Sequence, residues 1–142
     1  MEERVLLVDD EEKFLDMMAE RMRARGMQVS TAASATEALR LAEDESFDAI
    51  VLDLKMPEMD GIEVLKLLKK KRPDAQIILL TGHATVEKGI EAMKLGAMDF
   101  LEKPADLNEL TKKIKEAQTQ KMLVVEKALE EKVKEIIIHK GW

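Results

Sequence analysis

Apolar and polar residues alternate in blocks along this chain. Four short apolar runs each end in a chemically reactive residue. The segments between these runs place apolar residues at three- and four-residue steps, which is the spacing of one face of a helix. Strands that alternate with helices in this way predict a parallel sheet with helices on both faces. The predicted strands are 4–9, 28–32, 49–53, 76–81 and 99–103, each followed by a helix.

The polarity of the strands predicts their order in the sheet. Strands 4–9, 49–53 and 76–81 are almost continuously apolar, as central strands buried on both faces are. Strands 28–32 and 99–103 mix polar and apolar residues, which is typical of edges. Two edges and three centres fit the order 2-1-3-4-5 of a flavodoxin-like, doubly wound α/β fold. Ligands of such folds bind at the carboxyl ends of the strands, so we expect the site there.

The residues at these strand ends predict chemistry with a cation and a phosphoryl group. Asp9, Asp10 and Asp53 would converge on one crevice, and three carboxylates that repel each other need a cation. Oxygen ligands alone favour a hard ion, with Mg²⁺ before calcium. Asp53 closes a central strand and is the candidate nucleophile, because an aspartate can form an acyl phosphate. Lys103 would neutralise the charge of the phosphoryl group, and Thr81 would donate a hydrogen bond to it.

Each of these residues also has an ordinary structural interpretation when it is considered alone. Asp9 and Asp10 can cap the following helix, Asp53 can be a solvated strand end, and Thr81 is a common strand residue. Lys103, which precedes a proline, can belong to a simple turn. The functional interpretation rests on their conjunction at the same edge of the predicted sheet.

Length, composition and charge narrow the class of protein. The 142 residues, 46% of them hydrophobic, predict one globular domain with a short appendage. The net charge of −6 argues against direct nucleic-acid binding by this chain. The absence of cysteine excludes disulfides and thiolate metal sites. We expect a cytoplasmic protein without a membrane segment, because the apolar runs are short and the N-terminus lacks a basic region.

The motifs taken together resemble the receiver domain of two-component response regulators. They are Val-Asp-Asp at 8–10, the segment 53–61, Thr-Gly-His at 81–83 and the segment 99–104, and the resemblance covers residues 3 to about 120. The resemblance implies a CheY-like fold and a signalling phosphoacceptor in phosphorelay signal transduction. The segment 81–97 is particularly similar to receivers of sigma-54-dependent transcriptional activators.

The resemblance also implies roles for the residues at the predicted site. Asp53 would accept a phosphoryl group from a sensor histidine kinase, while Thr81 and Lys103 contact that group. Mg²⁺ would be bound directly by Asp10, by Asp53 and by the backbone carbonyl of Lys55, and by Asp9 through water. The protein would not be a conventional enzyme: only self-phosphorylation from small donors and slow self-dephosphorylation are expected.

A conformational switch and a tuning pair follow from the same resemblance. Thr81 would move toward the phosphoryl group and Phe100 would turn inward, remodelling the face of the fourth helix, fifth strand and fifth helix. Alternatively, Phe100 is a static edge-strand core residue. Lys55 and His83 would tune the hydrolysis rate, and His83 can also be a plain solvated loop residue.

The end of the chain has no place in the receiver pattern. We predict a receiver at 1–120 and a helical extension without an output domain at 121–142, with the last helix continuing to about 138. Apolar residues recur there at helical steps and leave three interpretations open: a stalk that pairs with a second copy, a segment that folds back on the receiver, or a fragment of a longer regulator. The expected partners are the kinase, a downstream protein or output domain, and a second copy through the fifth helix and tail. The stripe consists of Met122, Val125, Leu129, Val133 and Ile136.

Two other classes of function compete with the signalling switch. Haloacid-dehalogenase-type phosphatases also use a strand-end aspartate nucleophile on an α/β sheet. Their nucleophile begins an Asp-x-Asp motif, however, whereas the second residue after Asp53 is Lys55. The third hypothesis is a dimerisation scaffold with a vestigial site, and the full set of site residues argues against it.

Overall fold

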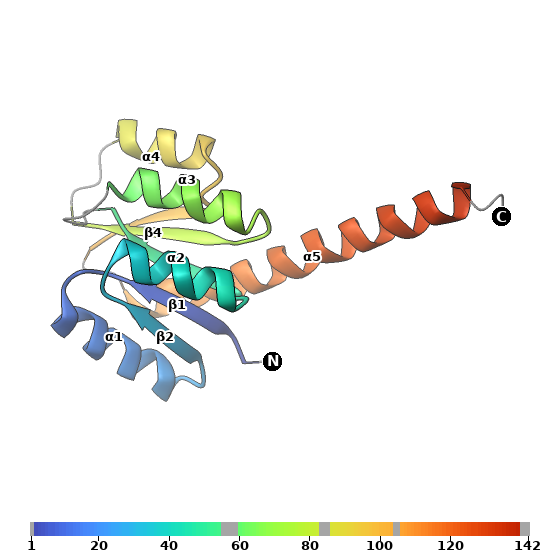
Figure 1. Ribbon diagram of the computed structural model, residues 1–142. Coiled ribbons are helices and arrows are strands. Elements are labelled where there is room, and N and C mark those ends of the chain that lie inside the picture. Colours follow the sequence, from blue (N-terminus) through green and yellow to red (C-terminus); the bar gives the residue numbers. More distant parts are fainter. Residues whose placement is uncertain (1, 55–59, 83–85, 104–105, 140–142) are drawn as a thin grey trace.

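The computed structural model shows strands and helices in strict alternation (Figure 1). It describes residues 2–54, 60–82, 86–103 and 106–139. Each predicted strand is found within one residue of its predicted bounds, so the α/β alternation read from the sequence is confirmed. The elements are β1 Arg4–Val8, α1 Glu12–Ala24, β2 Gln28–Ala32, α2 Ala35–Asp44, β3 Ala49–Asp53, α3 Gly61–Lys71, β4 Ile77–Thr81, α4 Val86–Lys94, β5 Asp99–Glu102 and α5 Leu107–His139.

The five strands form one parallel sheet in the order β2-β1-β3-β4-β5, as predicted. All residues of β3 and β4 are buried, whereas β2 and β5 at the edges are only partly buried. The order reverses between β1 and β3. The chain leaves the carboxyl ends of these two neighbouring strands toward opposite faces of the sheet, because α1 and α3 pack in different layers. The ends of β1 and β3 therefore form a topological switch point, where ligands of such folds bind.

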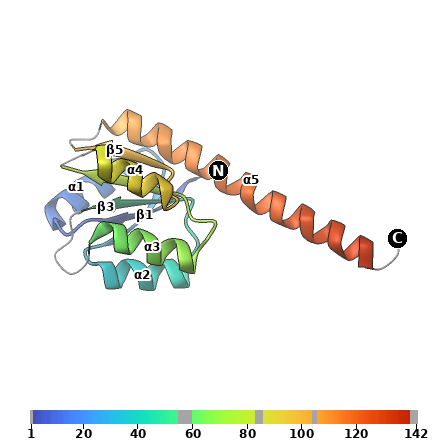
Figure 2. The ribbon, with the colours of Figure 1, turned by 90° about the horizontal axis from the view of Figure 1, so that it is seen from above.

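Two apolar layers hold the helices against the sheet. Alternate strand residues point to opposite faces, so Leu6 and Val8 pack in the layer under α2, α3 and α4. Val5 and Leu7 pack in the layer under α1 and α5. Figure 2 shows the same division, with α5 on the opposite side of the sheet from α2 and α3. Both faces of the central strands are thus shielded from water, which explains their unbroken apolar sequences.

Local signals in the sequence set the ends of the helices. The Oγ of Ser34 accepts a hydrogen bond from the backbone N–H of Glu37 at 3.2 Å and so caps α2. Asp106 accepts the N–H of Asn108 at 2.8 Å at the start of α5. Gly26 and Gly96, which follow α1 and α4, have φ values of 91° and 102°. Glycine reaches this left-handed conformation without the strain that a side chain would cause.

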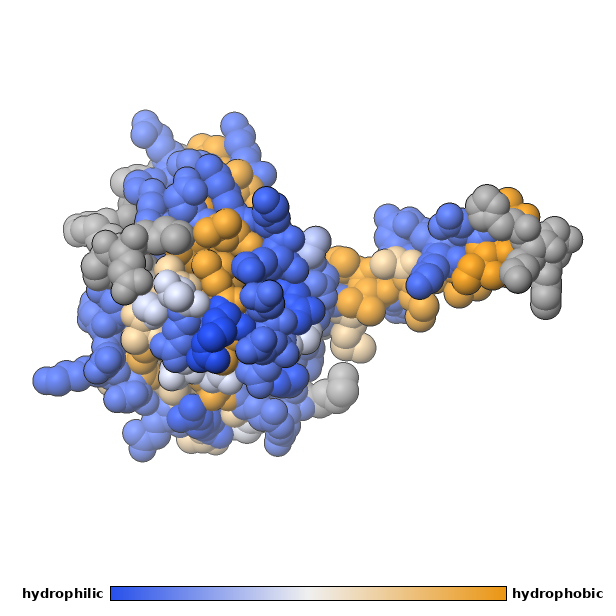
Figure 3. All heavy atoms as spheres, viewed as in Figure 1, coloured by the Kyte–Doolittle hydropathy of each residue, from blue (hydrophilic) through white to orange (hydrophobic). Residues whose placement is uncertain are grey.

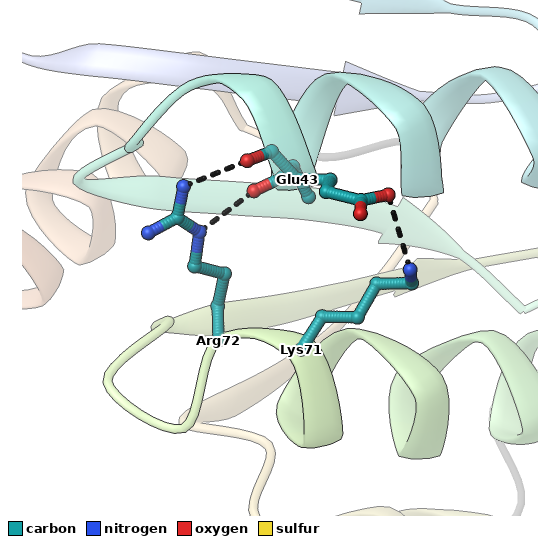
Figure 4. A network of polar contacts seen from close by, with 4 residues as sticks. Glu43, Lys71 and Arg72 are labelled. Atoms are coloured by element: carbon teal, nitrogen blue, oxygen red, sulfur yellow. Dashed lines mark hydrogen bonds and ion pairs between the residues drawn. The ribbon is translucent and has the colours of Figure 1, made fainter.

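Residues 69–72, a basic run at the end of α3, contact the last turn of α2 (Figure 4). The guanidinium of Arg72 donates to the carbonyls of Ala42 and Glu43 at 2.8 and 3.0 Å, and Lys71 lies 3.2 Å from the Glu43 carboxylate. These carbonyls belong to the last turn of α2, where intrahelical donors are lacking. The run therefore has a structural role that is sufficient to explain it.

The helix α5 continues well beyond the sheet, as Figures 1 and 2 show. It spans 33 residues without a break, so the predicted continuation of the last helix is confirmed. The described side chains from Met122 to Ile138 are all exposed. The hypothesis that the tail folds back on the receiver is therefore wrong. Whether the boundary at residue 120 separates two independent units stays a prediction.

Candidate functional site

The ends of four strands place the predicted site residues at one edge of the sheet. Asp9 directly follows β1, Asp53 ends β3, Thr81 ends β4, and Lys103 directly follows β5. The parallel register sets Asp53 opposite Leu80, so Thr81 lies one position further along the neighbouring strand. The backbone N–H of Lys103 donates to the carbonyl of Thr81 at 2.7 Å, which joins the last two strand ends.

Three carboxylates meet in the crevice between β1 and β3. Asp9, Asp10 and Asp53 each offer one oxygen, and these oxygens lie within 4.8 Å of one another. Asp9 and Asp53 are buried, whereas Asp10 is exposed at the mouth. Like charges this close, partly withdrawn from water, repel strongly and need compensation by positive charge. An all-oxygen set of this kind fits a hard divalent cation.

Lys103 supplies part of that positive charge. Its Nζ lies 2.6 Å from Asp9 Oδ2 and 3.7 Å from Asp53 Oδ2, and its side chain is only 17% exposed. Burial lowers the pKa of Lys103, but the hydrogen bond to Asp9 and the nearby carboxylate charges outweigh burial and raise it above its ordinary value. The ammonium is therefore charged at neutral pH. One ammonium against three carboxylates still leaves the crevice negative, which favours a further cation.

Asp9 does not cap α1, whose N-cap residue is Glu11 without a side-chain cap hydrogen bond. Its Oδ1 accepts a hydrogen bond from the backbone N–H of Glu11 at 2.9 Å, at the start of α1. One oxygen of Asp9 thus holds the helix entry, and the other holds Lys103. The same side chain thus joins the turn before α1 to the end of β5.

The sequence interpretation missed an aromatic residue at this site. The ring of Phe14, on the first turns of α1, has its centroid 4.3 Å from Lys103 Nζ. An ammonium at this distance over a ring is attracted by the negative face of the ring. The signal was available in part, because α1 follows the carboxylates directly and its first turns must overhang the crevice. A prediction that the ring lies over Lys103 would have needed both the order of the strands in the sheet and the rotation of α1 about its axis.

We expect Phe14→Leu to loosen Lys103 without removing the apolar packing of α1. The wild-type ring should shift the ε-methylene protons of Lys103 upfield in the NMR spectrum, and this shift should vanish in the variant. The loss of the cation–π contact should lower the free energy of unfolding by about 1 kcal/mol. Phe14→Tyr, which keeps the aromatic face, should retain both properties. An unchanged methylene shift in Phe14→Leu would show that the contact is not populated in solution.

A close backbone approach fixes the segment that follows Asp53. The N–H of Gly61 donates to the carbonyl of Leu54 at 2.9 Å, and a Cβ at Gly61 would lie 2.4 Å from the Leu54 Cα. Asp60 accepts the N–H of Ile62 at 3.1 Å and caps α3. The chain thus returns to the residue after Asp53 within a few positions, and only glycine fits at the point of contact.

The remaining predicted residues lie as follows. Thr81 is buried, and Phe100 is half-buried against the layer of α2, α3 and α4, beside Gly89 on α4. Whether Phe100 switches conformation stays a prediction. Lys55 and His83 are both predicted to tune hydrolysis, and Lys55 also to bind the metal through its carbonyl. Both lie outside the described residues. Among the helices of the described ranges, moreover, none is long and apolar enough for a membrane crossing.

Comparison of the sequence with known proteins identifies the family to which the chain belongs. Residues 5–115 match the model of the response regulator receiver domain. The photosynthetic apparatus regulatory protein RegA of Cereibacter sphaeroides is 40% identical over 107 residues, which cover 75% of this chain and 58% of RegA. This chain therefore spans little more than half the length of that relative.

Solved structures agree with the sequence comparison. The receiver domain of a response regulator from Clostridium thermocellum superposes with a TM-score of 0.82 at 35% identity, covering 86% of this chain and 98% of that one. A response regulator from Burkholderia pseudomallei, solved with a phosphorylated aspartic acid, a calcium ion and citrate, gives a TM-score of 0.76 at 29% identity. That match covers 99% of this chain and 86% of the other.

The strand-end carboxylates, the sheet order and these matches lead to one conclusion. The chain belongs to the response regulator receiver domain family and has the phosphorylatable, CheY-like fold of two-component signalling. The acidic cluster typical of such a domain is present at the carboxyl edge of its sheet.

Proposed function

We propose that Asp53 is the residue that accepts the phosphoryl group, from a histidine kinase and with Mg²⁺ bound beside it. The observation that carries the proposal is the convergence of three carboxylates with oxygens within 4.8 Å, next to the ammonium of Lys103. Asp53 ends a central strand and its side chain is 7% exposed, so it is held rigidly at the crevice. Asp9 has both its oxygens engaged, by Lys103 and by the Glu11 N–H, and Asp10 is exposed.

Asp9, Asp10 and Asp53 would hold the cation, and the carbonyl of Lys55 would complete its protein ligands. A bound Mg²⁺ supplies positive charge that neutralises the phosphoryl oxygens and the aspartates. The donor set fits this ion, because it consists of carboxylate oxygens, two of which belong to buried residues. The Burkholderia relative, which contains both a phosphorylated aspartic acid and a calcium ion, supports a site where the two occur together.

The side chains around Asp53 would have different roles in the transfer of the phosphoryl group. A carboxylate oxygen of Asp53 attacks phosphorus while the bond to the imidazole nitrogen of the kinase histidine breaks. The ammonium of Lys103, 3.7 Å from Asp53 Oδ2, then pairs with the new phosphoryl oxygens, and the hydroxyl of Thr81 donates a hydrogen bond to them. Lys55 and His83 would set how quickly water removes the group.

The phosphorylated state would be read by another protein or by an output domain in the cytoplasm. Movement of Thr81 toward the phosphoryl group would leave space into which Phe100 turns, changing the face formed by α4, β5 and α5. Phe100 already borders α4 at Gly89, so its reorientation would act on that helix directly. The protein would act as a switch rather than as an enzyme that turns over a substrate.

Phosphorylation of the whole chain by acetyl phosphate tests the assignment of Asp53. In the presence of magnesium, intact-mass measurement should show one added phosphoryl group on the wild type and none on Asp53→Asn. Asp10→Asn should reduce the extent of modification, because it removes a proposed metal ligand. Removal of magnesium with a chelator should likewise reduce the extent of modification of the wild type.

Three other outcomes would contradict the proposal. Full modification of Asp53→Asn would move the acceptor to another residue. Repeated hydrolysis of a phosphate ester would favour the dehalogenase-type phosphatase. No adduct at all, together with no binding of beryllofluoride, would favour the scaffold with a vestigial site.

A further inference from the structure

The ammonium of Lys103 is held at the crevice by partners from three different elements. Its Nζ lies 2.6 Å from Asp9 Oδ2 and 3.7 Å from Asp53 Oδ2, and the ring of Phe14 has its centroid 4.3 Å away. In the sheet, β3 and β4 separate β5 from β1, so a side chain from the end of β5 must extend across the sheet edge to reach Asp9. The stem of a lysine is long and flexible, so this extended position persists only while partners hold the ammonium.

Two of these three partners change when the site works as proposed above. Bound Mg²⁺ shares the negative charge of Asp9 and of Asp53, which weakens the attraction that holds the ammonium in the metal-free protein. The ring of Phe14 does not titrate, does not bind the metal and is not modified. Its attraction for the ammonium comes from the electron distribution of the ring and is therefore the same in every state of the site.

The packing of α1, and not the charge of the crevice, sets the position of this ring. Phe14 is partly buried against the apolar layer under α1 and α5, and its neighbours Leu15 and Met18 are buried in that layer. The segment before α1 is joined to the site as well, because Asp9 Oδ1 accepts the N–H of Glu11 at 2.9 Å. The ring is therefore a fixed contact for the mobile stem of a lysine.

The exposed apolar surface of α5 is too distant to share this role. Lys121 of α5 donates to Ser46 and to the carbonyl of Phe47, which precede β3 at the opposite edge of the sheet. The apolar side chains that follow Lys121 project beyond that edge, as Figure 3 shows. The aromatic contact with Lys103 thus comes from α1.

We propose that Phe14 is a positioning residue for phosphoryl transfer, whose ring keeps the ammonium of Lys103 at the crevice while Mg²⁺ shares the charge of the carboxylates. The proposal rests on the proposed function, because it assigns Lys103 to the phosphoryl group. In transfer from acetyl phosphate, an oxygen of Asp53 bonds to phosphorus as the bond from phosphorus to the acetate oxygen breaks, and acetate leaves with the electron pair. Negative charge on the phosphoryl oxygens must be balanced in this step, and Phe14 acts on it only through Lys103.

A double-mutant cycle tests whether the ring acts through Lys103. Intact mass measures the initial rate at which acetyl phosphate modifies the whole chain in saturating magnesium. Phe14→Leu should be about fivefold slower than the wild type, as expected for the loss of one cation–π contact, and Phe14→Tyr should stay within about twofold. In the Lys103→Met background, Phe14→Leu should have no further effect. Equal slowing with and without Lys103 would show that the ring acts through packing alone and would overturn the proposal.

Phe47 provides a matched control, because its ring also lies beside a cation. The Cζ of Arg4 is 5.9 Å from the centroid of the Phe47 ring, at the opposite edge of the sheet from the crevice. Phe47 is buried, so its replacement by leucine also removes a packed ring. Phe47→Leu should keep the phosphorylation rate within about twofold of the wild type, because the two sites are far apart. Slowing as large as that of Phe14→Leu would overturn the proposal.

Binding of beryllofluoride, a mimic of the phosphoryl group, distinguishes this proposal from the assignment of the acceptor. In magnesium, Phe14→Leu should bind beryllofluoride about fivefold more weakly than the wild type does. It should bind magnesium alone at least as tightly, since all three carboxylates remain. A wild type that neither binds beryllofluoride nor gains mass would contradict the assignment of Asp53, and this proposal with it. A wild type that does both, matched by Phe14→Leu in rate and affinity, would overturn only the role of Phe14.

Discussion

Replacement of Gly61 by alanine is expected to lower the free energy of unfolding by about 3 kcal/mol. The added Cβ would lie 2.4 Å from the Cα and 2.6 Å from the carbonyl oxygen of Leu54. These are backbone atoms, so rotation of a side chain cannot relieve the contact, and overpacking of this kind falls at the costly end of its range. Urea denaturation of the variant measures the loss.

Two other glycines provide matched controls for this substitution. Among the described residues, a Cβ at Gly82 has no neighbour within 4 Å, and the φ of Gly82 is not positive, so Gly82→Ala should stay within about 0.5 kcal/mol of the wild type. Gly89→Ala adds a methyl group in ordinary contact with Phe100 inside α4, where alanine favours helix by up to about 1 kcal/mol. A loss at Gly61 no larger than at Gly82 would show that the close approach to Leu54 is not kept in solution.

Replacement of Lys103 by methionine is expected to separate two effects of its charge. Without magnesium, the variant should lose roughly 3 kcal/mol of unfolding free energy, because Asp9 and Asp53 stay buried without their ammonium partner. With magnesium, most of this loss should be recovered. The rate of phosphorylation by acetyl phosphate should nevertheless stay about 100-fold below that of the wild type, because the variant lacks the ammonium that we propose pairs with the phosphoryl oxygens.

The charge-conserving variant Lys103→Arg distinguishes these effects further. It should keep the stability without magnesium, since a guanidinium also pairs with carboxylates. The phosphorylation rate of Lys103→Arg should fall between the rates of the wild type and of Lys103→Met, because the guanidinium is larger than the ammonium and has a different shape. A wild-type rate for Lys103→Met in magnesium would mean that Lys103 stabilises the crevice and does not contact the phosphoryl group.

The sheet and the convergence of the site could be predicted because they follow from short-range patterns. Unbroken apolar runs identified β1, β3 and β4 as central strands, and the reactive residues at their ends then had to share an edge. The predicted ends of β1 and β5 differ from the observed ends by one residue, because Asp9 and Lys103 lie just past these strands and not within them. Strand ends depend on backbone pairing, which side-chain polarity reports only indirectly.

Contacts between distant segments could not be predicted in the same way. The ring of Phe14 over Lys103 depends on the rotation of α1 about its axis, and the contact of Gly61 with Leu54 depends on the path of the chain after β3. The double engagement of Asp9 combines a local helix contact with a pairing 94 residues away. The sequence predicted helix capping as the structural alternative for Asp9, whereas the structure shows a bond to the N–H of Glu11, the N-cap residue.

Because α5 is continuous, a small tilt at its base produces a large displacement at its far end. No glycine or proline interrupts residues 107–139, and the helix begins four positions after Lys103. Its free part, beyond the last contacts at Lys121, is about 27 Å long at 1.5 Å per residue. A tilt of about 10° at the base would carry the tip about 5 Å sideways. Displacements at the sheet edge too small to disturb the core therefore become large at the far end of the helix.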